Sequence, residues 1–247
     1  MALRDYIIPS LATTCIIILL ITGPVSQDPG YHNFADTQEL VGIRNFLNVI
    51  SNLPFAIISL LGLWRLRKVK QQRLKHIICT LFIAFLLLTF GSGYYHLRPN
   101  NETLVYDRLP MVIIFMSFFS FIIHDRIDQS KGYRAFIVLN LVGILSVIYW
   151  IVTEHAGNGD LRWYGMIQFF PLVAIPLILI FYKSSFNHAK EIISIFIFFG
   201  VAKLTETFDK DIYEALNESI SGHSLKHLFM AAAEYLIVLQ VERRVKW

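Results

Sequence analysis

The sequence is short of charged residues, and this shortage excludes an ordinary soluble domain. Only 16% of its 247 residues are Asp, Glu, Lys or Arg, whereas a soluble domain carries about a quarter. Hydrophobic residues make up 55% of the chain, and the mean hydropathy is +0.54. They recur in runs close to the roughly 20 residues that a helix needs to cross a bilayer. The composition predicts a polytopic helical membrane protein.

The sequence also has only two cysteines, no linker and no stretch in which basic residues gather on one face. Cys15 and Cys79 both lie in hydrophobic runs, which favours neither a disulfide framework nor a thiolate metal site. The net charge of +4 comes from basic residues scattered over short loops, so we expect no nucleic-acid partner. No repeat, low-complexity tract or linker divides the chain, and we expect one compact bundle.

Eight hydrophobic segments are expected to cross the membrane as helices. The first could be a signal peptide, since Arg4 precedes its hydrophobic stretch. We favour a retained helix, because no small-residue cleavage pattern stands out after Thr22. The segments run approximately Tyr6–Val25, Asn45–Trp64, His76–His96, Leu109–His124, Ala135–Thr153, Tyr164–Tyr182, Ile192–Phe208 and His223–Val241. Pro171 and Pro176 should kink the sixth.

The basic residues lie in alternate loops and thereby predict the orientation. They follow the second, fourth, sixth and eighth segments, whereas the loops 26–44, 97–107, 154–163 and 209–222 carry few. Cytoplasmic loops are enriched in Lys and Arg. We therefore expect both termini to be cytoplasmic.

Three of the eight histidines are expected at one membrane level. His96 ends the third segment, and His223 and His227 open the eighth, all on the non-cytoplasmic side. A spacing of four residues puts two imidazoles on one helix face. This arrangement suits two ligands of a tetrahedral zinc ion, and His96 would supply the third. Because three neutral nitrogens leave a position for water, the pattern is typical of a catalytic zinc site.

Two further polar residues lie near these histidines in the predicted topology. Asp107 begins the fourth segment on the same side, where it is either solvated or the general base or acid of the reaction. Ser92 precedes His96 by one helical turn and shares its face. Its hydroxyl either bonds the backbone at a Gly-Ser-Gly packing point or donates to an oxyanion that develops during hydrolysis.

Polar side chains inside the other segments also need partners, since they are costly in a bilayer. Lys203 and Glu206 are three residues apart, and we interpret them as an ion pair or, alternatively, as support for the histidines. Asn52, from a polar stretch of the second segment, is another candidate for that support. Glu234 lies deeper in the eighth segment, and Lys203 is its expected partner.

Four stretches of the sequence form a recognisable set of motifs: Asn48-Val-Ile-Ser-Asn-Leu, Gly91-Ser-Gly-Tyr-Tyr-His, Tyr106-Asp-Arg-Leu-Pro-Met and Ser221-Gly-His-Ser-Leu-Lys-His. The most specific part is Ser-x-x-x-His, an Asp eleven residues later, and a distant His-x-x-x-His. Together the stretches resemble the alkaline ceramidase family, and the similarity extends from about Tyr31 to Val241. That family belongs to a superfamily of seven-helix membrane hydrolases that includes the adiponectin receptors.

The resemblance implies a zinc-dependent amidohydrolase. His96, His223 and His227 would hold zinc, Asp107 would activate water, and Ser92 would stabilise the oxyanion. The fold would be all-α: a seven-helix core within residues 31–247, preceded by an additional transmembrane helix and exit turn within residues 1–30. The reaction would cleave the N-acyl amide of a ceramide-type membrane lipid into a fatty acid and a sphingoid base.

Calcium is not favoured as a second metal. Eukaryotic members bind calcium through an acidic N-terminal segment, but the matching stretch here keeps only Asp36 and Glu39, and Asn45 stands where an acid is expected. Calcium takes about six or more oxygen ligands. In this respect the chain is more similar to bacterial members.

Two other functions stay open. A receptor-like zinc protein of the same superfamily, with little or no hydrolase activity, is the main alternative. A transporter is less favoured, because the polar residues gather at one membrane level and form no continuous pathway. The choice of N-acyl lipid and the oligomeric state are not predicted.

Overall fold

The computed structural model describes residues 3–183 and 189–245, and within these ranges the chain is helical with no β-strand. The predicted all-α fold is confirmed. The long helices are α1 (Ile7–Ile21), α3 (Leu53–Leu66), α4 (Gln72–Leu97), α5 (Asn101–Arg126), α6 (Gln129–His155), α7 (Arg162–Phe181), α8 (Ala189–Thr207) and α10 (Gly222–Val245). The short ones are η1 (Leu3–Tyr6), η2 (Pro29–His32), α2 (Phe46–Ile50) and α9 (Asp209–Ala215).

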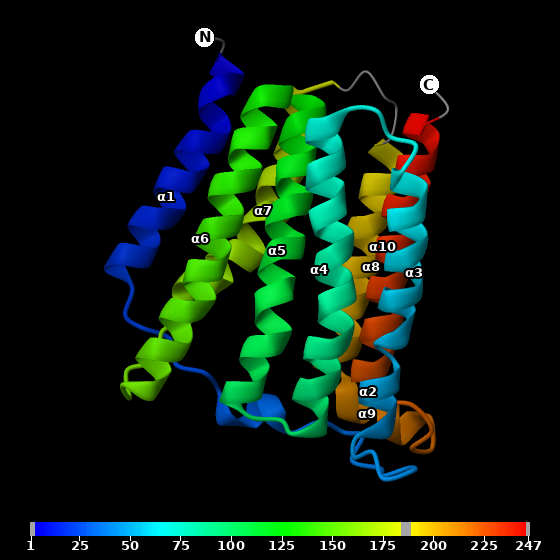
Figure 1. Cartoon of the computed structure of the whole chain (residues 1–247). Helices are drawn as coiled ribbons and strands as arrows, with labels where there is room; N and C mark the ends of the chain where they lie inside the picture. The colour runs from blue at the N-terminus through cyan, green and yellow to red at the C-terminus, as the bar shows by residue number, and fades with distance from the viewer. Residues whose placement is uncertain (1–2, 184–188, 246–247) are drawn as a thin grey trace.

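The long helices form one bundle. Helix α3 packs against α4 and α10, α4 against α5, and α5 against α6 and α7, while α8 packs along α10. In Figure 1, α6, α5, α4 and α3 form the nearer layer, and α7, α8 and α10 lie behind it. Helix α1 stands at the edge and contacts α7. Helix α1 begins, and α10 ends, at the same end of the bundle.

Seven segments of the described chain are long and hydrophobic enough to cross a membrane. The protein is a multi-pass membrane protein. These segments are α1, the α2–α3 pair, α4, α5, α6, α7 and α10. Helix α8 is the eighth member of the bundle but falls outside that group. It carries four charged residues: Lys190, Glu191, Lys203 and Glu206. The arrangement is the predicted seven-helix core plus α1.

The sequence suggested one helix for the second segment, but the structure has two. The segment is divided into α2 and α3 by a turn at Ser51 and Asn52. Pro54 lies in the first turn of α3, where its missing N–H is tolerated. The Asn52 side-chain amide donates to the Asn48 carbonyl at 2.9 Å. The polar stretch therefore forms the break and directs its side chains into the bundle.

The prediction that Asp107 begins a helix is wrong, because α5 starts eight residues before Leu109. Asn100 and Thr103 form a reciprocal capping box, with Asn100 Oδ1 accepting from the Thr103 N–H at 2.9 Å. Such a box satisfies exposed donors at a helix start. Asp107 consequently lies inside α5. The loop predicted over 209–222 likewise contains helix α9.

The two prolines of the sixth segment lie within one continuous helix, α7. Pro171 lines a cavity together with residues of α8, such as Phe196. The main hydrophobic core lies among α3, α4, α5, α7 and α10, with fully buried side chains including Phe55, Ile77 and Phe82. This core fixes the ends of α4 and α10 relative to each other.

Candidate active site

Three histidines converge where α4 ends and α10 begins, here called the site end of the bundle. His96, His223 and His227 are 1%, 4% and 4% exposed. Their ligand atoms lie within 4.8 Å of one another, and Nε2 of His223 is 3.2 Å from Nε2 of His96. Two nitrogens bound to one tetrahedral zinc at about 2.0–2.1 Å are about 3.3 Å apart. The group could hold a metal ion.

The His227 ring is oriented by Ser51. The Ser51 hydroxyl lies 2.8 Å from His227 Nδ1 and 3.2 Å from the carbonyl oxygen of Asn48. Since a hydroxyl has one proton, Ser51 donates to Asn48 and accepts from Nδ1–H. The lone pair of His227 then lies on Nε2. Hydrogen bonds of this kind fix the tautomer of metal-binding histidines.

The start of α10 is positioned by Asp209 and Gly222. The His223 N–H donates to Asp209 Oδ1 at 2.7 Å, and the Ala35 N–H donates to Oδ2 at 2.8 Å. A Cβ on Gly222 would lie 2.1 Å from the carbonyl oxygen of Thr205. Glycine is therefore needed for α10 to begin so close to the end of α8.

An aromatic side chain covers the histidines. The ring centroid of Phe34 lies 4.7 Å from that of His96 and 4.6 Å from that of His223. Phe34 comes from the segment between α1 and α2, outside the core helices. This segment therefore closes one side of the site.

Ser92 and Asp107 meet across α4 and α5, a contact that the sequence did not predict. Both are buried, and the Ser92 side chain hydrogen-bonds Asp107. Gly91 makes this approach possible, because a Cβ there would lie 2.0 Å from the carbonyl oxygen of Tyr106. The Asp107 carboxyl thus lies against a hydroxyl rather than in open solvent.

Charged side chains of α8 and α10 complete the site, and Lys226 among them was missed in the sequence. Lys226 Nζ donates to Glu206 Oε1 at 2.6 Å and lies 3.4 Å from His223 Nε2. Lys203 also pairs with Glu206, as predicted. The signal for Lys226 was present, since an ionisable residue inside a membrane helix is rarely without a role.

The hydrogen bonds found for the remaining candidates in the described part of the chain go to groups other than the histidines. Asn52 lines the cavity beside the site, but its amide bonds the α2 backbone. The predicted Glu234–Lys203 pair is absent among the described residues: Ser59 Oγ donates to Glu234 Oε1 at 2.7 Å. The Asp36 carboxylate accepts from the N–H groups of residues 38, 47 and 48 and so caps α2.

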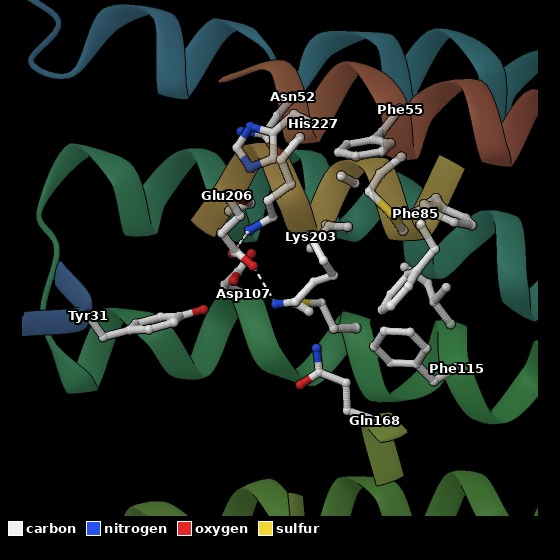
Figure 2. Close-up of a pocket in the computed structure, with 18 residues that line it drawn as sticks. Tyr31, Asn52, Phe55, Phe85, Asp107, Phe115, Gln168, Lys203, Glu206 and His227 are labelled. Carbon is white, nitrogen blue, oxygen red and sulfur yellow. Dashed lines mark hydrogen bonds and ion pairs between the residues drawn. The ribbon is translucent and has the colours of Figure 1, made fainter. Parts of the chain in front are cut away.

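A cavity extends from the site into the bundle. Figure 2 shows Tyr31, Asp107, Glu206 and His227 at one end of it and Phe55, Phe85 and Phe115 at the other. Its lining is polar beside the histidines and mostly hydrophobic at the far end. A polar group and an attached hydrocarbon chain would match this gradient.

The profile of the Ceramidase family matches residues 40–244, most of the chain. The chain belongs to the Ceramidase family. No curated protein matches it. Membership supports ceramide hydrolysis, and hence amide-bond cleavage, as the general activity. In this Ceramidase family member, the matched region contains every candidate site residue named above except Tyr31, Phe34, Ala35 and Asp36.

Proposed function

We propose that this protein is a zinc-dependent hydrolase that cleaves the N-acyl amide bond of ceramide-type membrane lipids, releasing a fatty acid and a sphingoid base. The convergence of three buried imidazoles beside the Ser92–Asp107 pair carries the proposal. Zinc held by His96, His223 and His227 supplies Lewis acidity for activating water and polarising the amide carbonyl.

Asp107 is the proton carrier in this proposal. Its carboxylate takes a proton from the attacking water, and the water oxygen bonds to the amide carbon. Asp107 then delivers that proton to the leaving nitrogen as the C–N bond breaks, so the products are a carboxylic acid and an amine. General acid–base catalysis of this kind contributes about 10²–10⁴-fold to a rate.

Ser92 and Lys226 stabilise the developing negative charge. In the resting site the Ser92 hydroxyl donates its one proton to the Asp107 carboxylate. Once Asp107 has taken the proton of the attacking water, the Ser92 hydroxyl donates to the carbonyl oxygen, which has become an oxyanion. The Lys226 ammonium, held by Glu206, adds positive charge beside His223. A charge held in place before the reaction is effective because it need not reorganise in the transition state.

The topology and domain division are also part of the proposal. Both termini are cytoplasmic, and the site end faces the non-cytoplasmic side, as the basic loops indicate. Residues 1–30 form a retained transmembrane helix with its exit turn, and residues 31–247 form the hydrolase domain. The family match begins at residue 40 and leaves α1 outside the matched region, which supports a separate N-terminal helix.

The test is a mass-spectrometric screen of the purified protein against a panel of N-acyl lipids, with metal content measured in parallel. Wild type should contain zinc and release fatty acid. Asp107→Asn should lose turnover by about 10²–10⁴-fold and keep its zinc. His223→Ala combined with His227→Ala should lose both.

Two outcomes would contradict the proposal. Undiminished zinc in the double histidine variant would exclude these histidines as the metal ligands. Bound zinc without cleavage of any N-acyl lipid, in wild type and Asp107→Asn alike, would instead indicate the receptor-like alternative.

A further inference from the structure

Glu234 is a buried carboxyl that the proposed reaction does not use. It lies on α10 seven residues after His227, two helical turns and about 10 Å deeper in the bundle. Met230 lies between them, so the three side chains follow one face of the helix at spacings of three and four. His227 and Met230 line the cavity at the site, and Met230 and Glu234 line the next one.

The two cavities adjoin. They share five lining residues, which come from α4, α5, α8 and α10. The shared residues are Phe85, Ile114, Phe115, Phe199 and Met230. A hydrocarbon chain that starts at the histidines and runs along α10 therefore reaches Glu234.

The Glu234 carboxyl is only half satisfied. It is 0% exposed, and Ser59 Oγ donates to Oε1 at 2.7 Å, but Oε2 has no hydrogen-bond partner among the described residues. Every other residue that lines the second cavity is apolar. Buried polar atoms are nearly always paired, and leaving one unpaired is costly. The free oxygen therefore marks a position where a ligand atom would be bound.

We propose that Glu234 selects lipids whose hydrocarbon chain carries a hydroxyl group about eight carbons from the scissile amide. This inference rests on the proposed function. An extended chain with C–C bonds of about 1.5 Å needs about eight carbons to cover the 10 Å between His227 and Glu234. A hydroxyl both donates and accepts, so it pairs with Oε2 whether or not the carboxyl is protonated.

A charged group is a poorer match for this position. An ammonium would bring three donors into a cavity whose remaining lining is apolar, and its lost hydration would not be replaced. A plain hydrocarbon chain leaves Oε2 unpaired. Sites built to bind a hydroxyl discriminate against analogues that lack it. The same hydroxyl could belong to the N-acyl chain or to the sphingoid chain.

The test compares kcat/KM for N-acyl lipids that differ only in one chain hydroxyl, moved from the fourth to the twelfth carbon. One series carries it on the acyl chain and a second on the sphingoid chain, which identifies the chain that occupies the cavity. In one series we expect a maximum near the eighth carbon, about fivefold to tenfold above the plain lipid.

Three variants distinguish the effect of the hydrogen bond between the chain hydroxyl and Glu234 from the effect of packing in the cavity. Glu234→Leu should bring the ratio of hydroxylated to plain substrate close to one, whereas Glu234→Gln keeps a donor and an acceptor and should retain a preference. Gln240→Met is the matched control. Gln240 is also buried on α10, and its side-chain atoms have no partner in the part of the chain that the structure describes. It lines a different cavity, so the substrate ratio of the variant should equal that of wild type.

Equal rates for all hydroxyl positions in wild type would overturn the inference, as would a preference that persists in Glu234→Leu. The position series needs no variant, so a folding defect in Glu234→Leu would not remove the test. If no N-acyl lipid is cleaved, the proposed function fails separately. In that case native mass spectrometry can compare the binding of free hydroxylated and plain fatty acids to wild type and Glu234→Gln. This comparison tests the role of Glu234 without turnover. Equal binding of both acids by wild type would overturn the inference.

Discussion

The Ser51 hydroxyl orients the ring of His227, a candidate zinc ligand. It bonds His227 Nδ1 at 2.8 Å, and Ser51 lies in the break between α2 and α3. We expect Ser51→Ala to weaken zinc binding by about 10–100-fold, the usual effect of losing such a partner. Competition with a chelator of known zinc affinity measures this change.

Ser59 provides the matched control for Ser51. It is also a buried serine, but it bonds Glu234 rather than a histidine. Ser59→Ala should therefore leave zinc affinity at the wild-type value. Equal zinc affinities in Ser51→Ala and wild type would show that the hydroxyl does not hold the ring.

Gly91 sets the distance between Ser92 and Asp107. In Gly91→Ala the new Cβ would meet the Tyr106 carbonyl oxygen at 2.0 Å, and backbone cannot yield as a flexible side chain can. We expect α4 and α5 to separate locally. The free energy of unfolding should fall by about 1–3 kcal/mol, as for other overpacked sites, and lipid hydrolysis should fall with it.

Gly93, two residues later on α4, is the control for this prediction. Its nearest neighbour to an added Cβ is Val49 Cγ1 at 3.9 Å, an ordinary contact. Gly93→Ala should leave activity unchanged and should not lower the melting temperature, since Ala favours a helix over Gly. Similar losses in both variants would argue against the close approach at Gly91.

The meeting of the three histidines could be predicted because two independent signals, the helical spacing and the charge of the loops, both indicate it. A spacing of four aligned His223 with His227, and the alternating basic loops brought His96 to the same level. A spacing of three on α10 makes His223 and Lys226 neighbours, so that approach could have been predicted. No local pattern indicated that Ser51 would hold His227 or that Glu206 would pair with Lys226. Those contacts depend on how far α2 and α8 lean toward α10, which the core packing decides.

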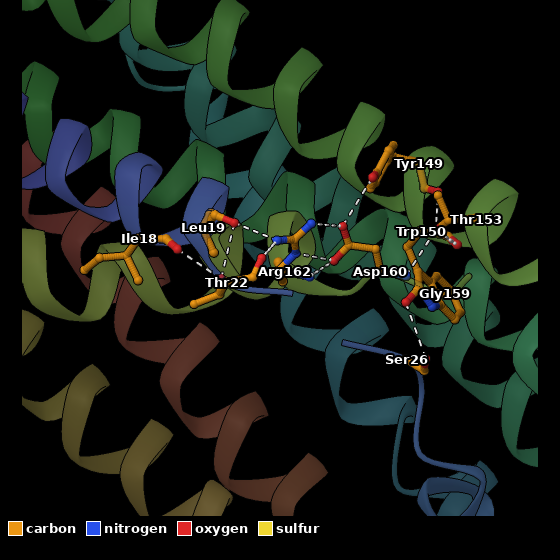
Figure 3. A network of polar contacts seen from close by, with 10 residues as sticks. All are labelled: Ile18, Leu19, Thr22, Ser26, Tyr149, Trp150, Thr153, Gly159, Asp160 and Arg162. Atoms are coloured by element: carbon orange, nitrogen blue, oxygen red, sulfur yellow. Dashed lines mark hydrogen bonds and ion pairs between the residues drawn. The ribbon is translucent and has the colours of Figure 1, made fainter. Parts of the chain in front are cut away.

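Helix α1 is attached to the bundle by Arg162, as Figure 3 shows. The guanidinium donates to the carbonyl oxygens of Leu19, at 2.7 Å, and Thr22. Asp160 holds the guanidinium through Nε and Nη2, both at 2.8 Å. The hydrogen bonds from Arg162 lower the pKa of Asp160.

This lowered pKa predicts a pH dependence. A carboxyl whose pKa is lower in the folded state stabilises that state at pH values above its unfolded pKa of about 3.9. The contribution is lost as the pH falls through the folded pKa. At pH 7, Asp160→Asn should melt about 2–4 °C below wild type, as for a loss of about 1 kcal/mol in a protein of this size.

Melting curves in detergent between pH 7 and pH 3 measure this effect. The gap between wild type and Asp160→Asn should narrow toward pH 3. Glu39→Gln, which removes an exposed carboxylate between η2 and α2, should show no such gap at pH 7. A gap that stays constant over the whole range would mean that the charge of Asp160 is not what stabilises α1.

Helix existence was easier to predict than helix ends. The hydrophobic runs located all eight long helices, but α5 begins at Asn101 because Asn100 and Thr103 cap it, and hydropathy does not register a cap. The turn at Ser51 coincides with the polar stretch of the second segment, which was predicted to be one continuous helix. These two errors matter for the site, since they place Asp107 inside a helix and put Ser51 at a break.

The charge of the two ends of the bundle predicts its orientation in the membrane. The end opposite the site carries the basic loop after α3, and the site end carries the loops around α9. If both termini are cytoplasmic, a membrane-impermeant thiol reagent should label a cysteine at the site end in intact cells. Glu214 on α9 and Lys68 after α3 are both exposed and suit single-cysteine variants in which Cys15 and Cys79 are replaced by Ala.

Glu214→Cys should react in intact cells, and Lys68→Cys only after permeabilisation. The physical reason is the distribution of Lys and Arg, which are retained on the cytoplasmic side during insertion. The opposite labelling pattern would place the histidines on the cytoplasmic side. Lipid substrate would then have to be supplied from that leaflet, whereas the predicted pattern restricts the enzyme to lipids of the non-cytoplasmic leaflet.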